Sequence, residues 1–200
     1  ALFIEHPSDR RNPPHSALTV PFTRLGPALA ACMTRTFVDG LHAPGARADA
    51  AEWEVALYKT LQRAYPLPSG KWTILGTGLP RATLHGDERI AGPVLAAQLY
   101  RETPQGLVDE QDYFVLFHHL ALHDWHLRMG TLPNEKADRT PRGYVAQHEG
   151  KWWLVNTSDT PWDVVDGPRI GRNASVECVP GLTLRIGDEL PARVLRIGTL

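Results

Sequence analysis

The chain has 200 residues, of which 42% are hydrophobic and 22% charged, enough to bury the core of one large domain or two small ones. Its 21 basic and 22 acidic side chains nearly cancel, and no Lys- or Arg-rich run stands out, so charge does not suggest a nucleic-acid or membrane-surface partner. Seventeen Pro and seventeen Gly residues predict many turns rather than long helices.

The two cysteines and the start of the chain indicate a cytoplasmic protein. Cys32 falls in a predicted helix and Cys178 in a predicted strand, so two separate buried thiols are expected rather than a disulfide. No apolar run is long enough to span a membrane, and the first residues do not form a signal peptide. Because the sequence also begins without Met, we expect a piece of a longer chain.

Two helices are predicted in the first part of the chain. Prolines exclude a helix from residues 1–21. Arg24–Val38 carries apolar residues at three- and four-residue spacing, which is typical of an amphipathic helix. Asp49 and Glu52 have the spacing of a capping box that starts a second helix, which should run to about Ala64. The face of this second helix that is expected to be buried carries Trp53, Leu57 and Leu61.

A change in composition at Tyr65–Gly70 predicts two domains, a helical one over residues 1–66 and a β-rich one over residues 71–200. Early strands are predicted at Lys71–Leu75 and Ala82–Leu84. Arg89–Tyr100 fits either a helix or a strand that begins at Val94.

The segment Gln111–Met129 is apolar and aromatic, and it predicts two strands or one bent strand. It contains the densest ionisable cluster of the chain, His118–His126. If this cluster were helical, His119, His123 and His126 would share one face at a spacing compatible with zinc. On strands, which we favour, the three side chains spread apart. The expectation is therefore no metal and no cofactor, and the alternative is a metal-dependent enzyme that uses this cluster.

Arg142–Asp188 has the pattern of a meander of short strands separated by turn signals. Asp166-Gly167 is the strongest hairpin signal in the chain. This regular spacing is typical of an antiparallel sandwich or barrel, so the predicted fold class is α+β, a short helical hairpin followed by an antiparallel β-sandwich. The predicted strands are Tyr144–Gln147, Trp152–Val155, Trp162–Val165, Ser175–Val179 and Leu182–Ile186.

Residues 1–65 resemble the end of a bacterial Ser/Thr protein kinase domain. In that family a helix, a turn with Gly, a Pro and an Arg lead to a helix that carries a Glu-Trp pair. The matching residues are Phe37, Gly40, Pro44, Arg47, Glu52 and Trp53. Ala48 follows Arg47, where the family usually has Pro. The family's Arg pairs with a Glu of the activation segment, and this sequence contains no such segment.

This resemblance implies a scaffold rather than a catalyst. The sequence has no Gly-rich phosphate loop, no strand Lys, no catalytic-loop Asp and no Asp-Phe-Gly. The chain alone is therefore not expected to be an enzyme, and a kinase reaction by these residues is excluded.

Residues 71–200 resemble the forkhead-associated (FHA) family, a β-sandwich that binds phosphothreonine. The family has a strand ending in Gly-Arg, a Ser-x-x-His loop, a Gly-x-Trp-x-Leu strand, an Asn-Gly turn and a closing Leu-x-x-Gly-Asp-x-Ile. His126–Gly130 stands for the first strand, Gly150–Asn156 matches the third element, Val165–Gly167 the turn and Leu182–Asp188 the last. Two departures fall in the loops: Arg128 precedes Gly130, and Thr140–Gly143 lacks the His.

The second resemblance implies a non-catalytic signalling module that docks a protein partner, either phosphorylated or the parent kinase domain. A phosphothreonine site needs a guanidinium fork together with hydroxyl and backbone donors. The candidates for this site are Arg128, Arg139, Thr140, Arg142, Thr157 and Ser158.

Overall fold

The computed structural model describes residues 3–16, 20–76, 88–90 and 92–200. The chain forms two compact units, Ala1–Gly92 and Pro93–Leu200. The division therefore lies later than the predicted change at Tyr65–Gly70. The reason is that β1 (Ala64–Pro66) and β2 (Trp72–Ile74) pair with each other as a small antiparallel hairpin, which belongs to the first unit.

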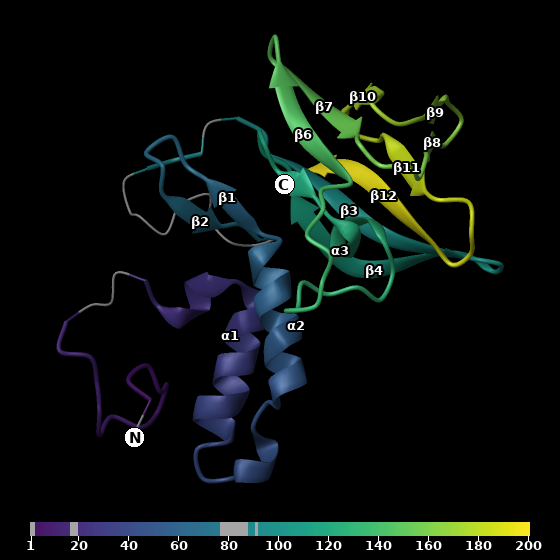
Figure 1. The fold of residues 1–200 in the computed structure, drawn as a ribbon. Helices are drawn as coiled ribbons and strands as arrows, with labels where there is room; N and C mark the ends of the chain where they lie inside the picture. The colour runs from purple at the N-terminus through teal and green to yellow at the C-terminus, as the bar shows by residue number, and fades with distance from the viewer. Residues whose placement is uncertain (1–2, 17–19, 77–87, 91) are drawn as a thin grey trace. The chain divides into compact units, whose positions relative to one another are not determined.

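The first unit contains two helices joined by short turns (Figure 1). Gly26, at a positive φ of 92°, separates a 3₁₀ turn from α1, whose first residue is Pro27. The capping box at the start of α2 is confirmed, because Glu52 N donates to Asp49 Oδ1 and Asp49 N donates to Glu52 Oε2, both at 2.9 Å. The elements are η1 (Phe22–Leu25), α1 (Pro27–Thr34), η2 (Arg35–Asp39), η3 (Pro44–Ala46) and α2 (Ala50–Leu61).

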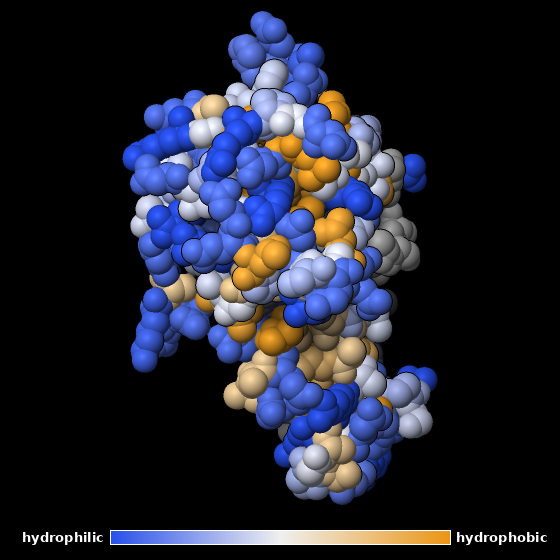
Figure 2. All heavy atoms as spheres, turned by 90° about the vertical axis from the view of Figure 1, so that its right-hand side faces the viewer, coloured by the Kyte–Doolittle hydropathy of each residue, from blue (hydrophilic) through white to orange (hydrophobic). Residues whose placement is uncertain are grey.

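The buried face of α2 differs from the prediction. Leu57 and Leu61 are 53% and 62% exposed, whereas the buried residues of the helix are Ala56 and Thr60. The contact with α1 centres on Ala56 of α2 and on Leu29 and Cys32 of α1, and Trp53 packs against this cluster. Figure 2 shows hydrophobic residues among hydrophilic ones on the surface of the chain.

The second unit consists of two antiparallel sheets and one short helix. The six-stranded sheet has the order β4-β3-β12-β11-β8-β9, and the four-stranded sheet has the order β10-β7-β6-β5. The elements are β3 (Leu95–Thr103), β4 (Gly106–Val115), β5 (Ala121–Leu122), α3 (Asp124–Leu127), β6 (Gly143–His148), β7 (Lys151–Asn156), β8 (Trp162–Val164), β9 (Arg169–Ile170), β10 (Ser175–Glu177), β11 (Thr183–Ile186) and β12 (Ala192–Thr199).

One hydrophobic core draws on both sheets of this unit. Val145 and Leu154 of the four-stranded sheet belong to the same buried cluster as Leu184 and Leu195 of the six-stranded sheet. Alternate residues of β11 are buried in this core, whereas β3, β4 and β12 carry runs of consecutive buried residues. The arrangement confirms the α+β class with mostly antiparallel sheets, and it is compatible with a β-sandwich.

The strands predicted in Arg142–Asp188 are confirmed, including the hairpin at Asp166-Gly167, where β8 pairs with β9. Arg89–Tyr100 yields strand β3 rather than a helix. The second strand predicted within Gln111–Met129 is wrong, because Asp124–Leu127 forms α3. His126–Gly130 is therefore not a strand, and Ala82–Leu84 lies outside the described residues.

Both cysteines are free and buried, as predicted. Burial raises the pKa of the Cys178 thiol to about 12, so this thiol stays protonated near neutral pH. Within the described ranges, no helix is both long and apolar enough to cross a membrane.

Candidate functional site: an arginine-lined cavity

The centre of the site is an ion-pair cluster around Asp124. The guanidinium of Arg142 donates two hydrogen bonds to this carboxylate, from Nε to Oδ1 at 3.1 Å and from Nη2 to Oδ2 at 3.0 Å. Arg128 Nε lies 3.3 Å from Asp124 Oδ1, and Arg142 Nη2 also lies 2.5 Å from Asp138 Oδ2. The hydrogen bonds to Asp124 raise the pKa of Arg142 above its usual value. The guanidinium of Arg142 is therefore positive and held in place.

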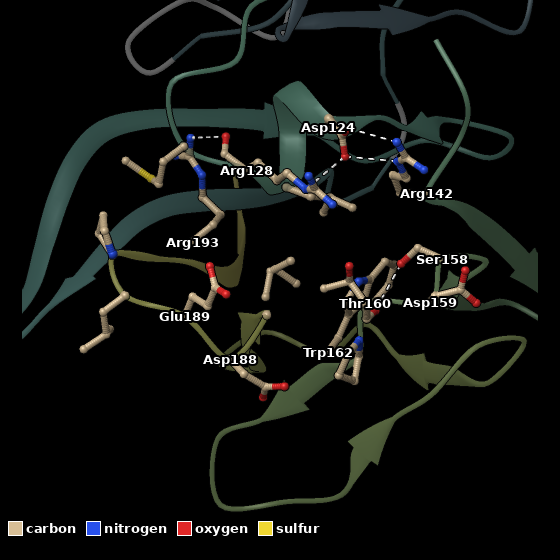
Figure 3. Close-up of a pocket in the computed structure, with 17 residues that line it drawn as sticks. Asp124, Arg128, Arg142, Ser158, Asp159, Thr160, Trp162, Asp188, Glu189 and Arg193 are labelled. Atoms are coloured by element: carbon tan, nitrogen blue, oxygen red, sulfur yellow. Dashed lines mark hydrogen bonds and ion pairs between the residues drawn. The ribbon is translucent and has the colours of Figure 1, made fainter. Parts of the chain in front are cut away.

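A cavity of about 700 Å³ opens beside this cluster, within the second unit. Figure 3 shows Asp124, Arg128 and Arg142 on one side of it, with Asp188, Glu189 and Trp162 across from them. The lining residues come from α3 and the residues just after it, from the segments before β6 and after β7, from the first residue of β8, and from the end of β11 through the start of β12. Loops at one end of two sheets thus meet around a single space, which is a common place for ligands to bind.

The backbone of Arg142 is held by two main-chain hydrogen bonds. Arg142 N donates to Leu122 O at 2.7 Å, and Arg142 O accepts from Thr157 N at 3.0 Å. The residue thus extends the hydrogen bonding of β6 to the ends of β5 and β7.

Asn156, the last residue of β7, holds the segment that carries Ser158. Its side chain is fully buried, and Nδ2 donates to Thr160 O at 2.9 Å and to Ile170 O at 3.0 Å. Asn156 Oδ1 accepts from Ser158 N at 2.9 Å and from Ser158 Oγ at 2.8 Å. This network places the Ser158 hydroxyl at the cavity.

Two buried nitrogen donors in the lining have no acceptor among the described residues. Arg193 is 7% exposed and pairs with Glu110, and its Nη2 donates to Arg128 O at 3.2 Å, but its Nε has no partner. Trp162 is 1% exposed, and its Nε1 is likewise unpaired. Buried donors are nearly always hydrogen-bonded, so these two are exceptions, but both atoms are shielded from the open space of the cavity.

The structure brings together three of the six predicted site residues. Arg128, Arg142 and Ser158 line the cavity. Thr157 lies beside it and donates from Oγ1 to Pro141 O at 3.2 Å.

The other two predicted residues lie elsewhere. Arg139 lines a separate cavity of about 270 Å³ with His123 and Trp125. Thr140 is exposed, and its N–H donates to Asp138 Oδ1 at 2.8 Å.

Sequence reasoning missed Asp124 as the partner of both arginines. An acidic residue four positions before an Arg readily forms an ion pair on a helix, and Asp124 and Arg128 have this spacing. The spacing indicates an ion pair only if residues 124–127 are helical, whereas a strand was predicted there.

The metal alternative is not supported by the described residues, among which no three His, Cys, Asp or Glu side chains gather as metal ligands. Only His126 lies within α3, so no continuous helix aligns it with the other two histidines. His119 lies in a turn at a positive φ of 68°, with its ring 3.7 Å from that of His118. The ring of His123 stacks on Trp125 at 4.3 Å.

His126 is buried in the neutral form. Burial, together with the positive charge of Arg193 and the nearby His123, lowers the pKa of His126 to about 3. Its Nδ1 accepts from His123 N at 3.0 Å, and its ring lies 5.0 Å from that of Phe114. The side chain thus acts as a packed, hydrogen-bonded core group.

Acid should destabilise the protein through His126. The unfolded state takes up a proton near pH 6.5 and the folded state does not, so stability present above pH 6.5 is lost as pH falls toward 3. This one residue should cost about 2 kcal/mol between pH 7.5 and pH 5. In His126→Asn the amide oxygen can accept from His123 N. This variant should lose the pH-dependent part of the unfolding free energy that His126 contributes, as measured from urea unfolding curves. His148→Asn, at an exposed position, is the control, and equal pH slopes for both variants would contradict this assignment.

Comparison with models of known protein families finds no match to this chain, and a search of curated proteins finds none either.

Proposed function

We propose that this chain is a non-catalytic interaction module whose second unit binds a protein segment carrying phosphothreonine. One observation carries the proposal: Arg128, Arg142 and Ser158, which come from three separate segments, line one cavity. The partner is a phosphorylated protein, or the kinase domain to which the first unit is related by resemblance.

The chemistry of the lining suits a phosphate monoester. A phosphorylated threonine carries nearly two negative charges and three strong acceptor oxygens at neutral pH. The planar fork of an arginine matches two of these oxygens. Two arginines around one cavity supply such forks, and the Ser158 hydroxyl can donate to a phosphate if it leaves its present acceptor, Asn156 Oδ1.

The acidic residues of the lining do not cancel this preference, because most of them are already paired. Asp159 pairs with Arg172 at 2.9 Å, and Asp188 pairs with Arg169 at 2.7 Å. Both partner arginines lie outside the lining. Their charges compensate the two aspartates, while Arg128 and Arg142 share the carboxylate of Asp124 and Arg142 also pairs with Asp138.

The resemblance to the FHA family adds support through its scaffold positions. Trp152 and Leu154 lie on β7, the Asp166-Gly167 turn joins β8 and β9, and Leu184 and Ile186 lie on β11. All of these elements are parts of the two antiparallel sheets. The ligand-binding loops differ from the family pattern, so the proposal uses the arginines that this chain places at the cavity.

The first unit also keeps contacts that fit its resemblance to the end of a kinase domain. Arg47 Nε donates to Gly40 O at 2.9 Å, and a Cβ added at Gly40 would lie 2.5 Å from Arg47 Cγ. The Gly and the Arg of the motif therefore depend on each other. These contacts support a scaffold role and explain why a kinase domain is one of the proposed partners.

Calorimetry with peptides tests this function. A degenerate phosphothreonine peptide library should bind the whole chain, and the same library without phosphate should not. Arg142→Ala should weaken binding at least about 10-fold, and Arg128→Ala should do so to a smaller extent, because each removes charge-assisted hydrogen bonds.

Arg139→Ala is the matched control, since Arg139 is exposed and does not line the cavity. Its affinity should stay within about 2-fold of the wild type, a change well below 1 kcal/mol. Equal binding of the phosphorylated and unphosphorylated libraries would contradict the proposal. So would equal losses in all three arginine variants.

A further inference from the structure

We propose that Asp124 is an internal competitor that occupies the anion-binding groups of Arg128 and Arg142 until a phosphoryl dianion displaces it. Asp124 would thereby set the selectivity of the cavity for phosphothreonine over acidic side chains. This inference rests on the proposed function and adds the residue that controls it.

The first step is the geometry of the ion pair. Arg142 uses Nε and Nη2 toward Asp124, which is the same edge of the guanidinium that matches the oxygens of a phosphate. Arg128 reaches the same carboxylate through Nε at 3.3 Å. A ligand that uses these groups fully must therefore take the place of the Asp124 carboxylate.

The second step is burial. The side chain of Asp124 is 15% exposed and that of Arg142 is 27% exposed, so solvent screens their attraction only partly. Exchange of the carboxylate of Asp124 for that of a peptide Glu brings no gain, because charge and geometry are the same. A dianion with three acceptor oxygens gains both charge and hydrogen bonds over Asp124.

The third step is the pair of unpaired donors, Arg193 Nε and Trp162 Nε1. Both side chains line the cavity and are more than nine-tenths buried. Arg193 also donates to the backbone of Arg128, so it belongs to the same wall. The two nitrogen atoms themselves are shielded from the cavity, so these side chains shape its wall and do not donate directly to a ligand inside it.

The fourth step is the anchoring of Asp124. Its carbonyl oxygen accepts from Arg128 N at 2.7 Å and from Thr131 Oγ1 at 3.0 Å. The backbone is thus fixed at the start of α3, and the side chain alone has to rotate when a ligand arrives. Such an exchange of partners within a fixed frame needs no rearrangement of the sheets.

Isothermal titration of three proteins tests the inference: the wild type, Asp124→Asn and Asp163→Asn. Each is titrated with a phosphothreonine peptide, with the same peptide carrying Glu at that position, and with the unphosphorylated peptide. Asp124→Asn should bind the phosphothreonine peptide at least 10-fold tighter than the wild type and should also bind the Glu peptide measurably. Asp163→Asn makes the same charge change at a residue outside the lining and should stay within 3-fold of the wild type.

The outcomes separate this inference from the proposed function. Phosphothreonine binding that is equal or weaker in Asp124→Asn would overturn the competitor role and leave the function standing. Absence of phosphothreonine binding in all three proteins would overturn both. Equal tightening in Asp163→Asn would show a general charge effect and would also overturn the inference.

A readout on the wild-type protein covers the case in which Asp124→Asn does not fold. The carboxyl ¹³C resonance of Asp124 should shift when the phosphothreonine peptide saturates the protein, because the carboxylate leaves Arg142. An unchanged resonance at saturation would overturn the inference.

Discussion

Asn156→Ala should lower the free energy of unfolding by about 3 to 5 kcal/mol, although it removes only a small side chain. Asn156 is fully buried and makes four side-chain hydrogen bonds. Its loss leaves the carbonyls of Thr160 and Ile170 and the N–H of Ser158 without these partners. Each buried group left unsatisfied costs about 1 to 3 kcal/mol.

Chemical denaturation of the wild type and the variant measures this loss. Asn134→Ala is the matched control, because Asn134 is exposed and its side chain accepts one local hydrogen bond, from Lys136 N. The control should lose less than about 1 kcal/mol. If both variants lose equal stability, the buried network of Asn156 is not what holds the loop of Ser158.

Gly143→Ala should destabilise the second unit by about 3 kcal/mol through overpacking. A Cβ at this position would lie 2.5 Å from the ring of Trp162 and 2.6 Å from Val155 O. The Trp162 ring is buried in the core, and the carbonyl belongs to the neighbouring strand β7. Neither can shift without a loss of stability. Because Gly143 follows Arg142, the strain should also disturb the cavity.

A double variant separates the two contacts at Gly143. Gly143→Ala with Trp162→Phe removes the ring atoms that clash but keeps the carbonyl of Val155, so its loss should be smaller than the sum of the two single losses. Gly198→Ala, in strand β12 with nothing within 4 Å of the added carbon, should change stability by less than about 1 kcal/mol. Thermal unfolding of the four variants measures this. Strict additivity would contradict the steric explanation.

Turn chemistry made much of the second unit predictable. The Asp166-Gly167 turn requires a positive φ, which Asp166 adopts at 61°, and it joins β8 to β9 as predicted. Strict alternation in Leu182–Ile186 predicted β11, where Leu184 and Ile186 are buried. Local signals of this kind depend on neighbouring residues, so they can be read without knowledge of the fold.

Contacts between distant segments could not be predicted in the same way. Asp124–Leu127 was predicted as part of a strand because it lies in the apolar and aromatic run Gln111–Met129, yet it forms a helix of one turn. Leu57 and Leu61 lie outward because α2 packs on α1 through the face that carries Ala56. Neither the periodicity nor the composition of α2 specifies which of its two apolar faces a neighbouring helix covers.

For the candidate site, too, local sequence indicated some features, and contacts between distant segments determined the others. The resemblance to the FHA family suggested a phosphate site, and the need for guanidinium and hydroxyl donors led to Arg128, Arg142 and Ser158 as candidates, three residues that line one cavity. Arg139 has the same chemistry, but its segment turns it into another cavity. The role of Asp124 depends on the distance to Arg142, eighteen residues away, and only the structure gives that distance.

The most direct test of the account is a chemical-shift map of the whole chain, labelled with ¹⁵N, during titration with a phosphothreonine peptide. We expect the largest chemical-shift changes at the side-chain Nε–H groups of Arg128 and Arg142 and at the amide of Ser158, with little change at Arg139. Shifts that centre on the segment of Arg139, or shifts of equal size with the unphosphorylated peptide, would contradict it.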